Sequence, residues 1–399
     1  MLVLSSWLYR AVAILALNVL IAFACLELAA LGYFKIKMSI LKSEPIEELV
    51  GEGDPREKVS YYASQDWAER YWYEFRLTRK QRYTSYVVWR RAPFKGKTIE
   101  IDQNGLRVTP GADCSAKSFK MFTFGESTMW GTGSPNWGTI PANLQKGLEK
   151  LRPGPVCVTN FAESAYTSTQ GVIMLLMQLQ SGNVPDSVLF YSISGDIGAA
   201  YQSGRADVHA NLDQFAARLE GRRKPETYVD RLKSTYSYKF IEMLMGKFTI
   251  ANPQAKPIPS QLITYESMGI DAATLSESIV QEYLENYKIV SALAQKYGFK
   301  YFFFSPPIIL LGNKPLTPEE QEMKDRMESD VPLSKLGTDV YTKIERESSK
   351  YQYLYSIDHI FDPYDSLIWI DGGHVTPIGN QLIAKRMLDI IQAESSDEK

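Results

Sequence analysis

The strongest constraint on the fold is an alternation, beginning at Ser118, of short apolar segments with longer segments of helical spacing. The apolar segments are interpreted as buried strands and cover residues 121–124, 156–161, 187–193 and 299–304. The segments of helical spacing cover residues 139–151, 170–179, 277–297 and 377–391. Strands that alternate with helices are typical of a parallel sheet covered by helices on both faces. The sequence therefore predicts an α/β fold.

Two longer segments interrupt this alternation. Residues 202–264 are expected to form helices inserted into the order of the sheet, with a proline-containing stretch at 252–259. Residues 317–349 form a charged helical segment in which Pro318 marks a helix start. Insertions that follow strands often shape a binding cleft, and solvated surface helices are the commoner alternative.

The N-terminal region is different in character, because residues 11–31 are almost wholly apolar. Asn18 and Glu27 are its only strongly polar members. A run of this length can cross a bilayer as a helix, and aromatic residues stand at both of its ends. A cleaved leader or a lipoprotein at Cys25 is the alternative, but the run stays largely apolar as far as Leu31. We therefore expect an uncleaved membrane anchor.

These patterns divide the chain into five parts. We expect an N-terminal flank over residues 1–10, a transmembrane helix over 11–34, a tether over 35–60, an aromatic-rich extension over 61–112 and a catalytic domain over 113–399. The extension is rich in aromatic and arginine side chains. These offer ring faces to sugars or, as the favoured alternative, pack as a cover over the sheet edge or rest at the membrane surface.

Charge and cysteine content exclude some functions and leave others open. The net charge of −2 gives no sign of a nucleic-acid partner. With three cysteines and three histidines, no metal-ligand cluster is predicted. Cys114 and Cys157 are expected near strands of one sheet, so a disulfide and two buried thiols are both open. Lys35, Lys37 and Lys42 after the anchor, against Arg10 before it, point weakly towards a cytoplasmic body.

Two short stretches carry residues for acyl transfer. Ser127 follows a predicted strand and Gly125, at a turn into a helix, where it is a nucleophile or simply a helix cap. Asp371 stands three residues before His374, on the loop that enters the last helix. This spacing lets the carboxylate hold imidazole Nδ1 while Nε2 faces the serine. His359 is a rival base in an apolar run, and His209 has no comparable context.

The chain resembles the SGNH, or GDSL-like, hydrolase superfamily, and more closely its membrane-anchored bacterial branch found with surface-polysaccharide genes. The resemblance runs from about Trp67 to the end and rests on residues 122–131, 160–170, 185–191, 199–204 and 371–374. It implies a flavodoxin-like three-layer α/β/α sandwich. It also implies that Ser127 is the nucleophile, His374 its base and Asp371 the residue that orients the base.

The same resemblance implies an oxyanion hole, and two of its parts depart from the family pattern. The Ser127 N–H is retained. The second donor is the N–H of Ala165, where the family has glycine, and the family's asparagine falls on Gly195. A water, or the hydroxyl of Ser192 or Ser194, can take the place of the asparagine as a hydrogen-bond donor. The alternative is that the site is inactive. Glu126 receives no role.

The function implied is a membrane-tethered serine esterase or acyltransferase that acts on O-acyl, chiefly O-acetyl, groups of cell-surface glycans, without a cofactor. The expected location is the bacterial cytoplasmic membrane, with the catalytic domain facing the periplasm or the cell exterior. Acylated glycan, the lipid bilayer and polysaccharide-assembly proteins are the implied partners. The alternatives are a non-catalytic protein that binds glycan or scaffolds an assembly complex, and a lipase or thioesterase.

Overall fold

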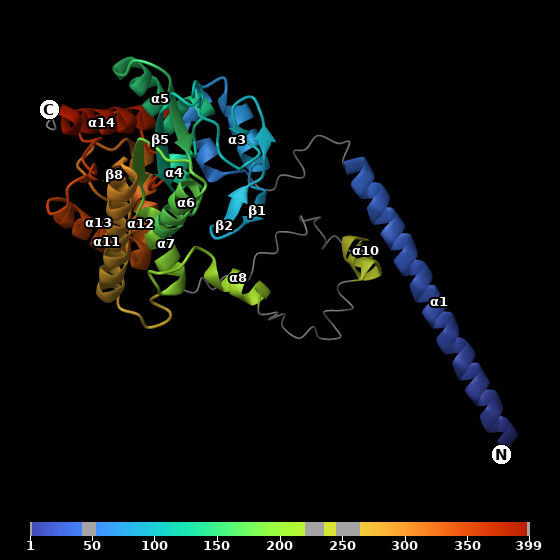
Figure 1. Ribbon diagram of the computed structural model, residues 1–399. Helices are drawn as coiled ribbons and strands as arrows, with labels where there is room; N and C mark the ends of the chain where they lie inside the picture. The colour runs from blue at the N-terminus through green and yellow to red at the C-terminus, as the bar shows by residue number, and fades with distance from the viewer. Residues whose placement is uncertain (1, 42–52, 220–234, 245–263, 397–399) are drawn as a thin grey trace. The chain divides into compact units, whose positions relative to one another are not determined.

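The computed structural model describes residues 2–41, 53–219, 235–244 and 264–396. These fall into two compact units (Figure 1). One comprises Met1–Gly53 with Ala216–Ser260, and the other comprises Asp54–Phe215 with Gln261–Lys399. Each unit is described by itself, and we call the second one the body.

The body is built around one parallel sheet of five strands in the order β6-β5-β7-β8-β9. The strands are β5 (Phe119–Gly125), β6 (Val156–Asn160), β7 (Ser187–Tyr191), β8 (Lys300–Ser305) and β9 (Leu354–Ser356). The first four are the strands expected from the apolar segments. The predicted α/β fold with a parallel sheet is therefore confirmed.

Alternate side chains of each strand enter two separate hydrophobic clusters, as the period-two geometry of a strand requires. Phe122 and Phe124 pack on one face of the sheet, and Met121 packs on the other. The first face is covered by α6 (Ser168–Gln180), α11 (Ala272–Tyr297) and α13 (Val331–Ser348). The opposite face is covered by α5 (Ile140–Leu151) and α14 (Pro377–Ser396). The sheet and its two helical covers form a three-layer α/β/α arrangement (Figure 1).

The aromatic-rich extension is part of the body and packs against the rest of it. It forms α2 (Ser60–Ala63), α3 (Ala68–Leu77), β1 (Gln81–Thr84), β2 (Val88–Arg91), β3 (Phe94–Lys95) and β4 (Glu100–Ile101). Tyr71, Trp72 and Trp89 are almost fully buried in the two clusters. Arg91 lies 3.9 Å above the Trp130 ring, and it forms an ion pair with buried Glu163. The interpretation of this region as a packed cover is therefore the one the structure supports.

The expected tether over 35–60 differs from the structure at both ends. The N-terminal helix continues through the first residues of that range, and the range ends in a folded 3-10 turn, η2 (Pro55–Lys58). Asp54 caps this turn by accepting from the Arg56 N–H at 3.1 Å, which is why a polar, charged stretch is ordered here. Residues 42–52 lie outside the described part of the chain.

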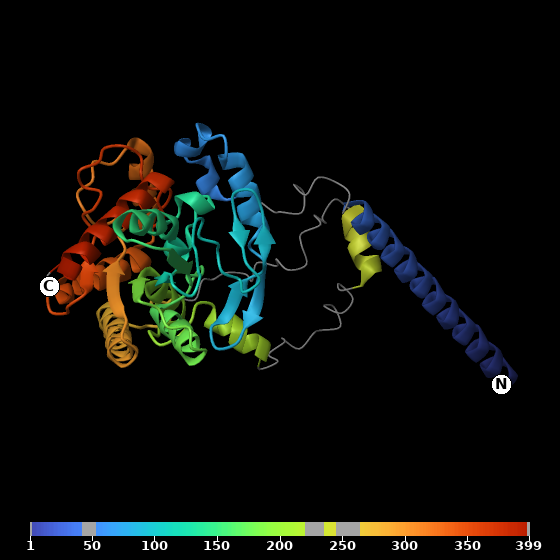
Figure 2. The same cartoon turned by 45° about the horizontal axis from the view of Figure 1, so that its top comes forward.

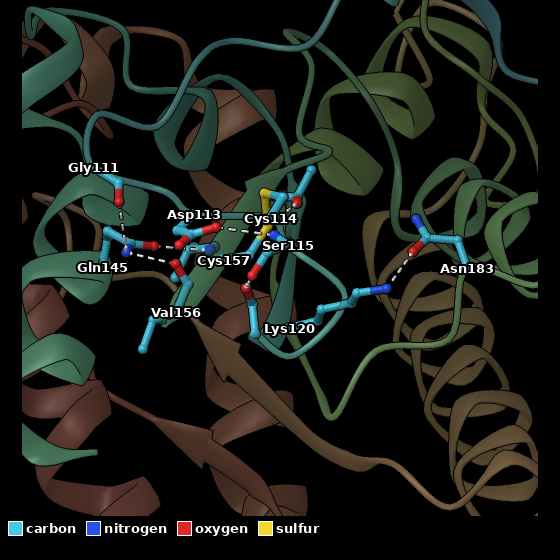
Figure 3. Close-up of a disulfide and its surroundings, with 12 residues drawn as sticks. Gly111, Asp113, Cys114, Ser115, Lys120, Gln145, Val156, Cys157 and Asn183 are labelled. Atoms are coloured by element: carbon cyan, nitrogen blue, oxygen red, sulfur yellow. Dashed lines mark hydrogen bonds between the residues drawn. A yellow bond between two sulfur atoms is a disulfide. The ribbon is translucent and has the colours of Figure 1, made fainter. Parts of the chain in front are cut away.

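Cys114 and Cys157 form a disulfide, with their Cα atoms 4.8 Å apart (Figure 3). The bond joins the segment before β5 to β6, the edge strand of the sheet. Beside it, the Gln145 side chain donates to the Val156 carbonyl at 2.9 Å and accepts from the Val158 N–H at 2.9 Å. Of the two alternatives left open by the sequence, the structure has the disulfide.

The two expected insertions are partly described. The charged segment forms α12 (Pro318–Ser329) and α13, with Asp330 between them as the cap of α13. The longer insertion includes the end of α7 (Ser194–Ser203), α8 (Leu212–Leu219) and α10 (Tyr236–Leu244). Its proline-containing stretch at 252–259 lies outside the described residues.

In the other unit, α1 (Leu2–Leu41) is a single helix of 40 residues. Within it, Trp7–Tyr33 is long and apolar enough to cross a membrane, and most of its apolar side chains are exposed. This stretch covers the transmembrane segment expected over residues 11–34 except for its last residue. Helix α10 belongs to the same unit and lies alongside α1 in both views (Figures 1 and 2).

Candidate active site

Ser127 lies where the central strand β5 turns into the short helix α4 (Ser127–Trp130). Gly125 allows this turn, because a Cβ atom there would lie 2.2 Å from the Tyr191 carbonyl oxygen on β7. The strand therefore ends against its neighbour with no room for a side chain, and the next residues project the serine into a cleft. A nucleophile at a strand-to-helix turn also lies beside the free N–H groups of the helix start.

The structure brings Ser127, His374 and Asp371 together. His374 Nε2 is 2.7 Å from Ser127 Oγ, and His374 Nδ1 is 2.9 Å and 2.8 Å from the two carboxylate oxygens of Asp371. A carboxylate can only accept, so a neutral imidazole carries its hydrogen on Nδ1 and uses Nε2 to accept from the serine hydroxyl. The loop keeps this shape because the Ile370 N–H donates to the His374 carbonyl at 2.9 Å, just before α14.

Asp371 is fixed in its ionised form. Its Oδ1 accepts from the N–H groups of Gly373 at 2.9 Å and His374 at 2.7 Å. Burial works to raise the pKa of Asp371, but His374, Arg56 and these N–H groups hold the pKa far below its ordinary value. The carboxylate is therefore charged at neutral pH, where it can stabilise an imidazolium beside it.

Arg56 is a member of the site that the sequence analysis missed. Its Nη1 lies 3.3 Å from Asp371 Oδ2, and its Nε and Nη2 form a fork on the carboxylate of Asp54, both at 2.8 Å. Its guanidinium also lies over the rings of Trp72 and Phe75, at 5.9 Å and 5.6 Å. Arg56 was assigned to the tether, and nothing in its local sequence indicates a contact with residue 371.

The oxyanion side of the site is assembled differently. Ala165 has a φ of 61°, in the left-handed region that favours glycine. Gly195 is packed against the backbone of Tyr166: a Cβ atom at 195 would lie 1.9 Å from the Tyr166 carbonyl oxygen. An asparagine therefore cannot occupy position 195 in this backbone.

A buried acid lies beside this position. Glu126 is 3% exposed, its Oε1 accepts from the Ser194 hydroxyl, and its Oε2 is buried with no hydrogen-bond partner. Burial raises the pKa of Glu126 to about 8, so the carboxyl is largely neutral at pH 7. Ser194 lines the cleft, whereas Ser192 is 1% exposed and its hydroxyl does not reach the cleft.

These residues line one cleft of about 750 Å³. Its apolar lining includes Ile197 of α7, Met323 and Met327 of α12, and Tyr341 of α13, together with Ile308 and Leu333. Both segments that interrupt the strand and helix alternation contribute to the cleft wall, the first through Gln202 and Ala210 and the second through α12 and α13. Arg56, Arg79, Arg91 and Arg326 supply its positive charge.

The other two histidines lie elsewhere. His359 is exposed and hydrogen-bonded through Nδ1 to Asp362 Oδ2 at 3.0 Å. His209 bonds through Nδ1 to the Ala210 carbonyl at 2.8 Å and packs against Trp89 and Phe215. Neither lines the cleft that contains Ser127. Within residues 2–41, 53–219, 235–244 and 264–396, no group of three or more His, Cys, Asp or Glu side chains is arranged to hold a metal ion.

No known family model matches this chain, and no curated protein matches it. Among solved structures, the chain is similar to an acetyl xylan esterase, with 14% identity, a TM-score of 0.38, and coverage of 68% of this chain and 99% of that one. It is also similar to a lipase from a goat rumen metagenome, with 12% identity, a TM-score of 0.37, and coverage of 68% and 97%. A lipolytic protein of the G-D-S-L family from Veillonella parvula has 11% identity, a TM-score of 0.35, and coverage of 68% and 98%. These values are low, and the fold is described above from the chain's own strands and helices.

Proposed function

We propose that this protein is a serine esterase or acyltransferase that uses Ser127, His374 and Asp371. The observation that carries the proposal is the 2.7 Å contact between His374 Nε2 and Ser127 Oγ, between residues that are far apart in the sequence but line one cleft. A base within hydrogen-bond reach of a hydroxyl, itself oriented by a carboxylate, is the arrangement that nucleophilic acyl transfer needs.

In the proposed reaction, Ser127 Oγ attacks the acyl carbonyl carbon while its proton passes to His374 Nε2. The imidazolium then gives this proton to the departing alcohol oxygen as the bond from carbon to that oxygen breaks, which leaves an acyl-enzyme. A water, or a second sugar hydroxyl, then attacks the acyl carbon and gives its proton to His374 Nε2. The bond from that carbon to Ser127 Oγ breaks as the imidazolium returns the proton to Oγ, which restores the free serine. Asp371 remains ionised and holds the imidazole throughout.

The negative oxygen formed in each step needs hydrogen-bond donors. The proposed donors are the N–H groups of Ser127 and Ala165 and the hydroxyl of Ser194, which takes the place of the missing asparagine. Burial keeps Glu126 largely neutral near pH 7. Its own O–H can then donate to Ser194 and leave the serine hydrogen for the oxyanion.

The proposed substrate is an O-acyl, chiefly O-acetyl, ester of a cell-surface glycan, and the proposed place is the outer side of a bacterial cytoplasmic membrane. Support for the substrate comes from the family resemblance and from an open cleft larger than an acetyl group needs. Support for the place comes from the apolar stretch Trp7–Tyr33 and from the disulfide, because disulfides are rare in the cytoplasm. Lys35, Lys37 and Lys42, which follow the apolar stretch, favour the opposite side and are outweighed by the disulfide.

A second candidate is a non-catalytic protein that binds glycan or scaffolds a polysaccharide-assembly complex. The observation that favours it is the packing of Gly195 against Tyr166, which excludes the family's third oxyanion donor. Loss of one such donor costs roughly a hundred- to a thousandfold in rate, so this candidate differs from a slow enzyme only in whether Ser127 reacts.

A fluorophosphonate probe separates the two candidates, since it labels a serine that has been activated by its base. We expect the full-length protein to be labelled and to hydrolyse p-nitrophenyl acetate, and Ser127→Ala to lose both properties. Ser64→Ala, which removes an exposed serine, is the control and keeps both. A wild-type protein that takes no label and hydrolyses no ester would support the second candidate.

The side of the membrane on which the body lies is tested separately, by fusing reporters after Lys42. A periplasmic phosphatase reporter that is active there, with an inactive cytoplasmic reporter, is the expected result. The opposite pattern would place the body in the cytoplasm and overturn this part of the proposal.

A further inference from the structure

Glu27 is the acidic residue inside the apolar stretch Trp7–Tyr33, and it has hydrogen-bond partners on another element. Its Oε1 accepts from the Tyr236 N–H at 2.7 Å, and its Oε2 accepts from the N–H and the hydroxyl of Ser237, both at 2.8 Å. These donors are the N-terminal groups of α10. Glu27 therefore caps a helix that the sequence places in the insertion, some two hundred residues further on.

A second contact fixes the direction of α10 along α1. The rings of Tyr33 and Phe240 meet edge to face, with their centroids 5.2 Å apart. Glu27 precedes Tyr33 by six residues, which is about 9 Å along a helix. Helix α10 thus begins beside Glu27, within the apolar stretch, and runs towards the end of that stretch at Tyr33.

Burial in lipid explains why these groups pair. A carboxylate in the hydrocarbon region is costly, and so are the free N–H groups at a helix start, because no water is present to bond with either. Each satisfies the other, and the positive end of the α10 dipole adds to the attraction. Ser237 is 3% exposed, and the apolar Ile241 on the same helix is 45% exposed.

We propose that α10 is a second membrane element, which enters the outer part of the bilayer beside α1 and is held there by Glu27. This inference rests on the proposed role of α1 as a membrane anchor. The partner surface is lipid: the exposed apolar side chains of α1 and Ile241 of α10 face the acyl chains, and the Tyr33–Phe240 pair lies at the interface, where aromatic rings are favoured.

The consequence concerns the attachment of the body. The chain leaves the body through α7 and α8, and α7 contributes Ile197 and Gln202 to the wall of the candidate active site. If α10 stays in the bilayer, the protein is attached to the membrane by two segments, the one after α1 and the one that continues from the cleft wall. A single anchor leaves the body free to rotate about one tether, whereas two attachments restrict this rotation.

Depth-dependent quenching tests the proposal on the full chain in phospholipid vesicles. In a Cys25→Ser background, single cysteines replace Leu20 on α1, Ile241 on α10 and Lys385 on the exposed side of α14, and each carries an environment-sensitive fluorophore. We expect the label at 241 to be quenched by lipids with a shallow nitroxide and to be protected at least fivefold from aqueous iodide, relative to the label at 385.

The label at 20 reports on the anchor itself. If it is protected while the label at 241 is quenched by iodide as strongly as the label at 385, α1 is in the membrane and α10 is not, and the inference is wrong. If the labels at 20 and 241 are both open to iodide, the membrane anchor of the proposed function fails, and the inference fails with it.

The role of Glu27 is tested by a cross-link between cysteines that replace Tyr33 and Phe240 in the same background. We expect oxidation to join them within one chain. Glu27→Gln keeps an acceptor oxygen and should retain most of the cross-linking rate, whereas Glu27→Leu should lower the rate at least fivefold. Equal rates in the three proteins would show that Glu27 does not hold α10.

Discussion

The two halves of the candidate active site differ in how completely they are built. On the acid–base side, the Ser127–His374–Asp371 chain is continuous, and Asp371 is bonded to two N–H groups and to Arg56. On the oxyanion side, Ala165 adopts a glycine conformation, and Gly195 leaves no room for an asparagine. One half is a complete chain of hydrogen-bonded side chains, and the other half has no side-chain donor at position 195.

The two halves of the candidate site depend on different kinds of groups. The acid–base side depends on side chains, and replacement of any one of them breaks the hydrogen-bonded chain. The oxyanion side depends largely on backbone N–H groups, which any residue other than proline supplies if the chain adopts the required angles. A residue other than glycine at 165 is therefore compatible with the proposed oxyanion hole, whereas replacement of Asp371 or His374 removes a side chain that the hydrogen-bonded chain needs.

The largest expected effect is on the acid–base side. Asp371→Asn would present an amide N–H to Nδ1, so the imidazole would carry its hydrogen on Nε2 and could no longer accept from Ser127. We expect kcat for ester hydrolysis to fall by about 10⁴-fold, the size seen for such a change in serine hydrolases. Asp362→Asn is the matched control, because Asp362 contacts His359 with the same spacing, outside the cleft. Equal activity of the two variants would contradict the assignment of Asp371.

The second largest expected effect is on the oxyanion side. Ser194→Ala removes the one hydroxyl proposed to replace the missing asparagine, and we expect kcat to fall by about a hundredfold with KM nearly unchanged. Ser192→Ala is the control, because that hydroxyl is buried away from the cleft. If Ser194→Ala has wild-type kcat, a water or the two N–H groups alone must stabilise the oxyanion.

The sequence could predict those parts of the fold and of the site that rest on local patterns. Four of the five parallel strands and the positions of Ser127, Asp371 and His374 were readable, because each rests on a local pattern: a short apolar run, a turn after a strand, or a fixed spacing before a helix. Strand β9 was missed because its three residues, Leu354–Ser356, lie in an apolar run too short to show alternation.

The rest of the site depends on contacts between distant segments. The place of Arg56 beside Asp371 follows from the packing of α3 under it, and its polar neighbours made the stretch look like a tether. The disulfide also stayed open, because spacing alone does not reveal which strands are neighbours. That Gly195 is closed off by Tyr166 is visible only when both backbones are placed.

Glu126 links the oxyanion side to stability. The ordinary pKa of a glutamate is 4.5, and burial raises that of Glu126 to about 8. Between these values the native protein holds a proton that the unfolded chain has released. Its contribution to the free energy of unfolding is therefore fully present below pH 4.5 and is lost as the pH rises through 8.

We therefore expect Glu126→Gln to reduce the loss of stability between pH 5 and pH 9 by on the order of 4 kcal/mol, since the amide is neutral at every pH. Urea unfolding of the full chain in detergent at both pH values measures this. Burial also raises the pKa of Asp196 to about 6 and that of Asp358 to about 7, so part of the wild-type loss should remain. An unchanged loss in Glu126→Gln would show that Glu126 is already ionised at pH 5.

The smallest expected effect concerns the acid–base side again and tests the contact between Arg56 and Asp371. Arg56→Met removes the contact to Asp371 Oδ2 but leaves His374 and two N–H groups on the carboxylate, which keep it ionised. Activity should then fall through a less fixed orientation, by about tenfold in kcat, with no shift of the pH optimum. Arg56→Lys should recover part of this loss.

The control is Arg79→Met, because Arg79 shares Asp54 and the Phe75 ring with Arg56 but has no hydrogen bond to Asp371 in the described structure. If both methionine variants lose activity equally, Arg56 acts only by packing the extension onto the body, and the reinforcement that distinguishes the two halves is structural rather than electrostatic.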